Sequence, residues 1–316
     1  MPPLPEGLLI ELVTPLTPTG SLDQGSLTQL IGRMRASAAA VVAGSPGVGE
    51  ALELPNSLRL ELFIALVQNL PPQLPLFFGI TGATPEETQN FALQLEDEAK
   101  NQSHSGPLYW VDLPLWWHSN RGLPQAYQEL SRSLSHPLVI MNHPHLIRGK
   151  AEPFKHVNLR TAIFKKMSAL PGVAGMIYQG EIRRFLHYYA ARASRPDFML
   201  YEADERRFLS RPGARGLVSA GAQLFPVIWQ TVIKSCLFPE EIKVSGKQLN
   251  QIWEWSDLLL RLYELYQFYP APLLKLGLYQ QGILDFAAVW PATPACPGHL
   301  ADRFLEFLES IKINTN

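Results

Sequence analysis

Short apolar runs alternate along the chain with longer segments in which apolar residues recur every three or four positions. Apolar runs of about four to eight residues are typical of buried strands, and the longer period is typical of helices that pack one face on a core. The runs predict strands at 8–13, 39–43, 74–78, 108–111, 138–141, 173–177, 198–201 and 217–219. The amphipathic segments predict helices at 26–35, 56–69, from 84 onward, 124–134, 157–169, 181–194 and 203–210.

Two of these helices carry residues that favour a helix start. Asn56 precedes an amphipathic segment and is expected to cap it with its side-chain oxygen. Thr84 and Glu87 have the spacing of a capping box, and Pro85 stands at the first helical position, where a proline is well tolerated.

The regular alternation of strand and helix favours parallel strands, because each parallel pair needs a crossover connection. Eight such units within residues 1–225 predict a closed (β/α)8 barrel, the TIM barrel. An open, doubly wound parallel sheet is the alternative.

The strand pattern ends after residue 225. The remaining residues predict helices at 227–236, 249–266, 272–281 and 300–311, separated by Pro270, Pro272 and the proline-rich stretch 291–297. The chain is therefore expected to consist of a barrel over 1–225 and a helical extension over 226–316 that packs on the barrel.

Composition narrows the class of protein. Of 316 residues, 47% are hydrophobic and 17% charged, and the formal net charge is −1, so neither disorder nor binding to nucleic acid or anionic lipid is expected. The only cysteines, Cys236 and Cys296, suit a reducing compartment. No uncharged apolar run reaches the roughly 18 residues of a membrane span, and the N-terminus lacks the features of a signal peptide. We therefore expect a cytoplasmic protein with no membrane segment.

Six segments, at 12–23, 48–54, 79–84, 137–144, 171–177 and 216–219, match motifs of one barrel family in order and spacing. Through them the chain resembles the dihydrodipicolinate synthase and N-acetylneuraminate lyase family, whose members are class I aldolases acting on pyruvate. The resemblance spans nearly the whole chain. It implies lyase chemistry on the barrel and a homo-oligomer, either a dimer or a tetramer.

The resemblance also locates the family's chemical groups, and most are replaced here. The lysine that forms the Schiff base aligns with Ile177, which has no amine to attack a ketone. The proton-relaying tyrosine aligns with Met141. The hydroxyls that bind the substrate carboxylate align with Gly47 and Val48, or leave only Ser45 if two residues are inserted.

Two further family positions also differ. The relay tyrosine supplied by a neighbouring subunit falls within 115–117, and Arg148 could replace the arginine at the substrate entrance after a short loop extension. The aromatic cluster Trp116-Trp117-His118 is expected to pack against a partner subunit, with a stacking wall for a ligand as the alternative. The pocket-lining candidates are Ser45, Gly47, Val48, Trp116, Trp117, Met141, His143, His145, Arg148, Ile177 and Ser219.

Other polar residues allow alternative chemistries. His143 and His145 follow the fifth strand and could bind a metal with Asp112, Glu202 or Asp204, with His118 as a further candidate, although an ordinary polar loop is the simpler interpretation. The glycines at 44–49 lack the lysine of a phosphate-binding loop. No metal or other cofactor is predicted.

Relocation of the catalytic lysine to Lys165, Lys166 or Lys275 is also open, but none of the three is expected at the mouth of the barrel. Glu50 matches the family's loop and is expected to satisfy backbone groups near the second strand. Tyr263, Tyr266 and Tyr269 have near-helical spacing, which favours core or interface positions over a binding site.

Two functions follow. The first is a dihydrodipicolinate synthase-like protein that has lost Schiff-base chemistry and binds a ligand, or a catalytically intact paralogue, without turning a substrate over. The second is an enzyme acting in the same pocket, either on a 2-oxo acid such as pyruvate through a relocated lysine or through a metal at His143 and His145.

Overall fold

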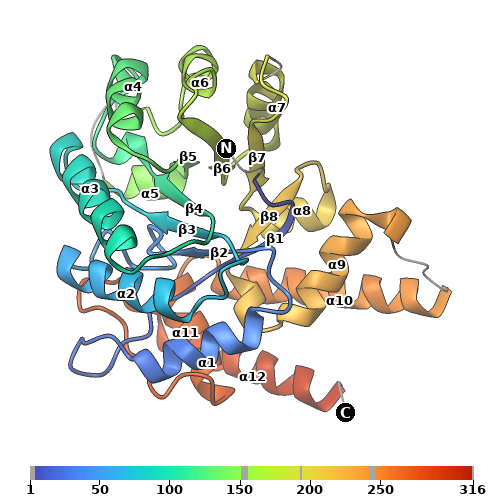
Figure 1. The fold of residues 1–316 in the computed structure, drawn as a ribbon. Coiled ribbons are helices and arrows are strands. Elements are labelled where there is room, and N and C mark those ends of the chain that lie inside the picture. Colours follow the sequence, from blue (N-terminus) through green and yellow to red (C-terminus); the bar gives the residue numbers. More distant parts are fainter. Residues whose placement is uncertain (1–3, 151–155, 193, 242–245, 315–316) are drawn as a thin grey trace.

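The computed structural model describes residues 4–150, 156–192, 194–241 and 246–314. Eight parallel strands close into a barrel in which each strand pairs with its sequence neighbours and the last pairs with the first (Figure 1). The strands are β1 Gly7–Glu11, β2 Ala40–Ala43, β3 Leu76–Gly79, β4 Leu108–Asp112, β5 Leu138–Asn142, β6 Val173–Tyr178, β7 Met199–Glu202 and β8 Gly216–Ser219. The predicted TIM barrel is confirmed, and the open sheet is excluded.

Helices connect the strands and surround the barrel (Figure 1). They are α1 Gln24–Met34, α2 Asn56–Asn69, α3 Pro85–Asn101, α4 Leu123–Ser133, α5 Pro144–Gly149, α6 Thr161–Ser168, α7 Ile182–Ala191 and α8 Glu205–Ser210. The short helix α5 was not predicted, because six residues are too few to show a helical period. Its local signals are Pro144 in the first turn and His143, whose ring accepts a hydrogen bond from Leu146 N.

One strand is shorter than its apolar run. β1 ends at Glu11, although the run continues to Val13. The amide of Leu12 still donates to Val42 O (2.8 Å), but Val13 N donates to the side chain of Gln223 (3.0 Å) instead of to a strand. The apolar run thus predicts burial correctly and the end of the ladder incorrectly.

Helix starts differ in how well they were predicted. The expected cap at Asn56 is wrong, because Pro55 is the N-cap and Asn56 is the first helical residue, where its Oδ1 accepts from Arg59 (2.9 Å). At α3, Thr84 caps the helix as predicted, with its hydroxyl accepting from Glu87 N (3.1 Å). The Glu87 carboxylate accepts from Ala83 N (2.9 Å), one residue earlier than a capping box requires.

Thr84→Ala removes this cap, and we expect it to lower the free energy of unfolding by about 1 kcal/mol, because an amide at the start of α3 loses its acceptor. Thr84→Ser keeps a hydroxyl and is the matched control. Urea denaturation of both variants measures the difference, and equal stability of the alanine and serine variants would contradict the capping role.

Aromatic side chains fill the interior of the barrel. The ring of Phe77 on β3 lies 4.7 Å from that of Tyr109 on β4 and 5.9 Å from that of Tyr201 on β7. Because β3 and β7 are not neighbours, the second contact crosses the interior. The Tyr201 hydroxyl donates to Pro5 O (2.8 Å), so the N-terminal segment covers the end of the barrel at which the strands begin.

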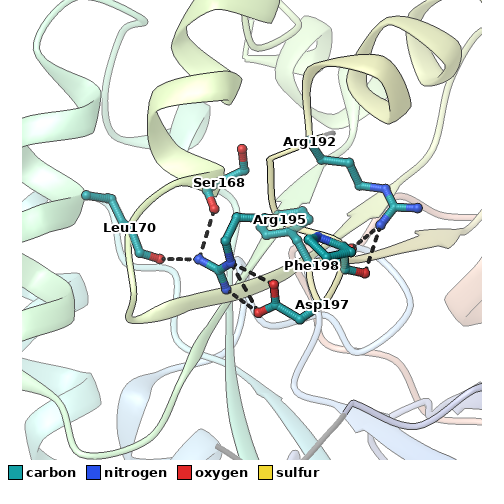
Figure 2. A network of polar contacts seen from close by, with 7 residues as sticks. Ser168, Leu170, Arg192, Arg195, Asp197 and Phe198 are labelled. Carbon is teal, nitrogen blue, oxygen red and sulfur yellow. Dashed lines mark hydrogen bonds and ion pairs between the residues drawn. The ribbon is translucent and has the colours of Figure 1, made fainter.

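Two arginines between α7 and β7 form hydrogen bonds and an ion pair with residues around them, as Figure 2 shows. The Arg195 guanidinium donates to the carbonyls of Ser168 (3.2 Å) and Leu170 (3.3 Å) and forms an ion pair with Asp197 (2.7 Å). Arg192 donates to Phe198 O (2.8 Å). These bonds join the end of α6 to the start of β7, at the end of the barrel remote from the strands' carboxyl ends.

In the described residues, four α-helices follow the barrel: α9 Pro226–Leu237, α10 Gly246–Tyr266, α11 Pro270–Gln280 and α12 Gly298–Asn314. α9 packs against β1, α10 against α8 and α9, and α12 against α10 and α11 (Figure 1). The division of the chain at residue 225 stays a prediction. Within the described ranges, no helix is both long enough and apolar enough to span a membrane.

Candidate functional site

A cavity of about 570 Å³ opens at the carboxyl ends of the strands. Residues at or just after the strand ends form its base, and the end of α10 with the start of α11 forms one wall. This is the end of a TIM barrel where active sites are built. Apart from the tyrosines, the polar side chains that line the cavity are Glu11, Glu50, Glu53, His143, His145, Gln179, Glu205, Gln267 and Thr293.

Glu11, the last residue of β1, places a carboxyl group at the base of this cavity. The residue is only 8% exposed. Burial raises the pKa of the Glu11 carboxyl to about 7, against a lowering by a hydrogen bond from the Ser45 side chain and with a further rise from the charge of Glu205. Ser45 is fully buried, and its Oγ also accepts a bond from Gly49 N (3.1 Å).

Glu205, the first residue of α8, is the second buried carboxyl group in the cavity. Its Oε1 accepts from the Ser219 hydroxyl (2.7 Å) and from Gly221 N (3.0 Å), and its Oε2 accepts from the Tyr266 hydroxyl. Burial raises the pKa of Glu205, although these donors oppose the rise. Through these hydrogen bonds Glu205, which lines the cavity, links Ser219 at the end of β8 to Tyr266 at the end of α10.

Aromatic side chains form much of the wall. Tyr263, Tyr266, Phe268 and Tyr269 come from the end of α10 and the turn that follows. Trp116 comes from the 3-10 helix η1 Pro114–Trp116 after β4. The sequence favoured core positions for the three tyrosines, and Tyr263 and Tyr266 are indeed buried, but all three also line the cavity.

The position aligned with the aldolase lysine lies in the barrel interior. Ile177 on β6 is fully buried and is the Cα partner of Met141 on β5. Met141 lines the cavity, and paired residues of neighbouring strands face the same side of a sheet. Ile177 therefore faces inward beside the base of the cavity, where a lysine at the same position would point. None of the cavity-lining residues in the described chain is a lysine.

The other lysines considered lie elsewhere. Lys165 and Lys166 are exposed on α6, outside the barrel. Lys275 on α11 is fully buried, but its ammonium group is paired with Glu50 and donates to Ala288 O (2.8 Å). Burial lowers the pKa of Lys275, and the Glu50 carboxylate opposes that change.

Glu50 joins the loop after β2 to the C-terminal part of the chain. Besides Lys275, its carboxylate accepts from Trp290 N (2.8 Å) and from the Thr293 hydroxyl (2.7 Å). The expectation that it satisfies backbone groups is met by Trp290 N, but its other partners are side chains, and all three partners lie more than 200 residues later in the chain. Glu50 has φ of 57°, a left-handed conformation that costs a non-glycine residue energy and that these contacts hold in place.

The predicted pocket residues divide into two groups. Gly47, Val48, Trp116, Met141, His143 and His145 line the cavity. Ser45, Trp117, Arg148, Ile177 and Ser219 do not. Ser45 and Ser219 lie behind Glu11 and Glu205 as hydrogen-bond donors, and Arg148 is exposed on α5.

Trp117 belongs to a buried network beside the cavity. Its indole N–H donates to Asp112 Oδ1 (3.1 Å), which also accepts from the Thr81 hydroxyl (2.8 Å), while Tyr127 donates to Oδ2 (2.6 Å). The rings of Trp117 and Tyr127 are stacked with an interplanar angle of 7°. Asp112 therefore fixes the loop that carries Trp116, and its oxygens are already occupied.

The suggested metal ligands are not brought together. The rings of His143 and His145 lie 6.2 Å apart, and burial followed by the charge of His145 lowers the pKa of His143 to about 4. Glu202 is paired with Arg207, and Asp204 caps α8. In the described part of the chain, no three His, Cys, Asp or Glu residues lie close enough to hold a metal ion.

Sequence reasoning missed the two buried glutamates. Glu11 is the only charged residue within the apolar run 8–13, and a lone carboxylate at the end of a barrel strand was an available signal. Glu205 lies three residues after the end of β7, but its neighbour Asp204, and not Glu205, was considered as a possible metal ligand. Their proximity is a property of the closed barrel, in which β1 and the β7–α8 turn meet at one mouth.

Comparison with known proteins supports the resemblance seen in the sequence. No family model matches the chain. A 4-hydroxy-tetrahydrodipicolinate synthase of Protochlamydia amoebophila is 23% identical over 238 residues, which cover 73% of this chain and 74% of the relative. The dihydrodipicolinate synthase of Bacteroides thetaiotaomicron is similar in structure, with 21% identity, a TM-score of 0.79 and coverage of 98% of this chain and 100% of that one.

A second solved structure, the chloride-inhibited dihydrodipicolinate synthase of Acinetobacter baumannii complexed with pyruvate, gives 18% identity and a TM-score of 0.78. It covers 98% of this chain and 100% of that one, so the similarity includes the helices after the barrel. The predicted resemblance to the dihydrodipicolinate synthase family is confirmed, and at these identities it establishes the fold.

Proposed function

We propose that the chain is a dihydrodipicolinate synthase-like protein that forms no Schiff base and binds a small molecule reversibly in the cavity at the barrel mouth. The observation that carries the proposal is Ile177, fully buried at the position where the resemblance places the lysine. A hydrocarbon side chain cannot attack a carbonyl group, so the covalent step of a class I aldolase has no nucleophile there.

The rest of the site supports the same conclusion. Met141 lines the cavity in place of the proton-relaying tyrosine, and a thioether has no proton to transfer. Val48 lines it where the resemblance expects a hydroxyl for the substrate carboxylate. The cavity nevertheless has room for a ligand, since its volume of about 570 Å³ lies within the usual range of small-molecule sites.

We expect no covalent adduct when the protein is incubated with pyruvate and borohydride and its intact mass is measured. Borohydride reduces an imine to a stable amine, so a Schiff base on any lysine would leave a mass increase. A dihydrodipicolinate synthase that has the lysine, treated in parallel, is the positive control. An adduct on one lysine would overturn the proposal and show that the enzyme uses a relocated amine.

The proposal includes assembly and location. We propose a cytoplasmic homo-oligomer, a dimer or a tetramer, in which the loop with Trp116 and Trp117 approaches a second subunit, either an identical one or an intact paralogue. Mass photometry of the purified chain, alone and co-expressed with a lysine-bearing paralogue, tests this part. A single monomeric species in both samples would contradict it.

A further inference from the structure

We infer that the cavity binds an organic cation, with its ammonium group against the carboxylate of Glu11. The inference rests on the proposed function, because it takes the cavity as a ligand site and names the chemical class of the ligand. Three features support it: the charges that line the cavity, the surroundings of Glu11 and the aromatic wall.

The charges that line the cavity are predominantly negative. Four glutamates contribute to the wall, and no lysine or arginine of the described chain does. Glu50 is neutralised by Lys275 from behind the wall, and Glu53 is exposed at the surface. Glu11 and Glu205 remain as buried carboxyl groups without an ion-pair partner in the described chain.

Of these two groups, Glu11 is the one with capacity for a ligand. Glu205 already accepts hydrogen bonds from Ser219, Gly221 and Tyr266. Glu11 is more than nine-tenths buried, and within the described residues its interaction with a hydroxyl is the one with Ser45, while its side chain borders the cavity. Because an unpaired buried charge is costly, such a group either keeps its proton, as the raised pKa of Glu11 indicates, or ionises beside a cationic partner.

The aromatic wall suits the same class of ligand. The electron-rich ring faces of tyrosine and tryptophan attract cations, most strongly where water is excluded. Tyr263 and Tyr266 line the cavity that Glu11 borders, so an ammonium group would meet carboxylate and aromatic surface together. The ring of Trp116, which also lines the cavity, already has the Lys150 ammonium group 4.7 Å from its centroid. An aliphatic body attached to that group would pack against apolar residues such as Val48 and Met141.

The same charges disfavour an anionic ligand. A 2-oxo acid would place a carboxylate in a cavity whose described lining residues include two buried carboxyl groups and no lysine or arginine. Like charges at short range in a poorly screened site repel strongly. The inferred ligand is therefore a cation and not the 2-oxo acid that the resemblance implies, and this difference goes together with the replacement of the reactive lysine by Ile177.

Titration calorimetry of the whole chain tests the inference with four probes that each have a four-carbon chain: butylammonium, 1,4-diaminobutane, butan-1-ol and butanoate. We expect both amines to bind at least tenfold more tightly than butan-1-ol, and butanoate to bind more weakly still. Glu11→Gln keeps the shape of the side chain and removes its charge, so it should weaken amine binding at least tenfold. Glu61→Gln, an exposed change on α2, should have no effect.

The pH profile separates a cation site from a structural carboxyl group. With the pKa of Glu11 near 7, a proton competes with the amine, and binding at pH 6 should be about tenfold weaker than at pH 8. The Glu11→Gln variant should show no such change. Other titratable groups that share the cavity are Glu50, Glu53, His143, His145, Glu205, Tyr263 and Tyr266.

Three outcomes would overturn the inference. The first is binding of butan-1-ol or butanoate as tightly as butylammonium, which would leave the reversible ligand site of the proposed function in place. The second is unchanged amine affinity in Glu11→Gln. The third is the absence of binding by either amine. Failure of the proposed function is read separately, as a covalent pyruvate adduct in the borohydride experiment.

Discussion

Lys275→Met is expected to lower the free energy of unfolding by about 3–5 kcal/mol, the usual effect of removing one partner of a buried ion pair. The ammonium group of Lys275 and the carboxylate of Glu50 are both fully buried. Without Lys275 the carboxylate keeps its bonds from Trp290 and Thr293 but loses its only cation in the described chain. Urea denaturation at pH 7 measures the loss.

The double variant Glu50→Gln/Lys275→Met is the control. It removes both charges, and we expect it to recover much of the stability lost in the single variant, because no unpaired charge is left buried. A single variant that loses less than about 1 kcal/mol would show that water or another group reaches Glu50, and would contradict the paired arrangement.

Glu11→Gln is expected to make stability less dependent on pH. The pKa of this carboxyl group is raised from 4.5 to about 7 in the folded protein, so its contribution to stability is complete below pH 4.5 and is lost as the pH rises through 7. A shift of this size corresponds to about 3 kcal/mol. Relative to wild type, the variant should therefore gain up to about 3 kcal/mol between pH 4.5 and pH 8.

Urea denaturation of wild type and Glu11→Gln at both pH values gives this difference, and Glu61→Gln serves as the exposed control. The comparison isolates Glu11 from Glu202, Glu205 and Asp112, whose pKa values are also raised by burial. A constant difference between the two proteins across the pH range would contradict a buried carboxyl group with a raised pKa at this position.

A gain of stability in Glu11→Gln together with a loss of amine binding would be typical of a binding residue. Sites that hold a charge ready for a ligand do so at the expense of folding stability. The two measurements concern the same atom and have opposite signs, so no general disruption of the fold could produce both.

The barrel could be predicted from the sequence because its strands are buried on both faces and appear as continuous apolar runs. Runs such as 138–141 and 173–177 are short, uninterrupted and separated by amphipathic segments, so both the number and the direction of the strands follow. The boundaries were less certain, as the unpredicted α5 and the early end of β1 show. Hydrogen-bond partners outside the ladder decide such ends, and a local pattern does not contain them.

The aligned family positions could also be located, because Met141 and Ile177 are fixed by the register of neighbouring strands. The residues that form the cavity wall could not be located in this way. Tyr263 and Tyr266 show only that one side of α10 is buried, and a helical period does not say which part of the barrel that side contacts. The partners of Glu50 were missed for the same reason, since a buried carboxylate gives no sign in the sequence of a cation 225 residues away.

The hydrogen bond from Tyr266 to Glu205 has a thermodynamic consequence. It makes the docked position of α10 part of the intact site, because undocking would remove both an aromatic wall and the donor to Glu205. A ligand that binds only the intact site therefore raises the free energy needed to undock α10 by the free energy of its binding. Occupancy of the barrel mouth should therefore slow amide hydrogen exchange along α10 back toward its start at Gly246, beyond the last turns, whose tyrosines line the cavity.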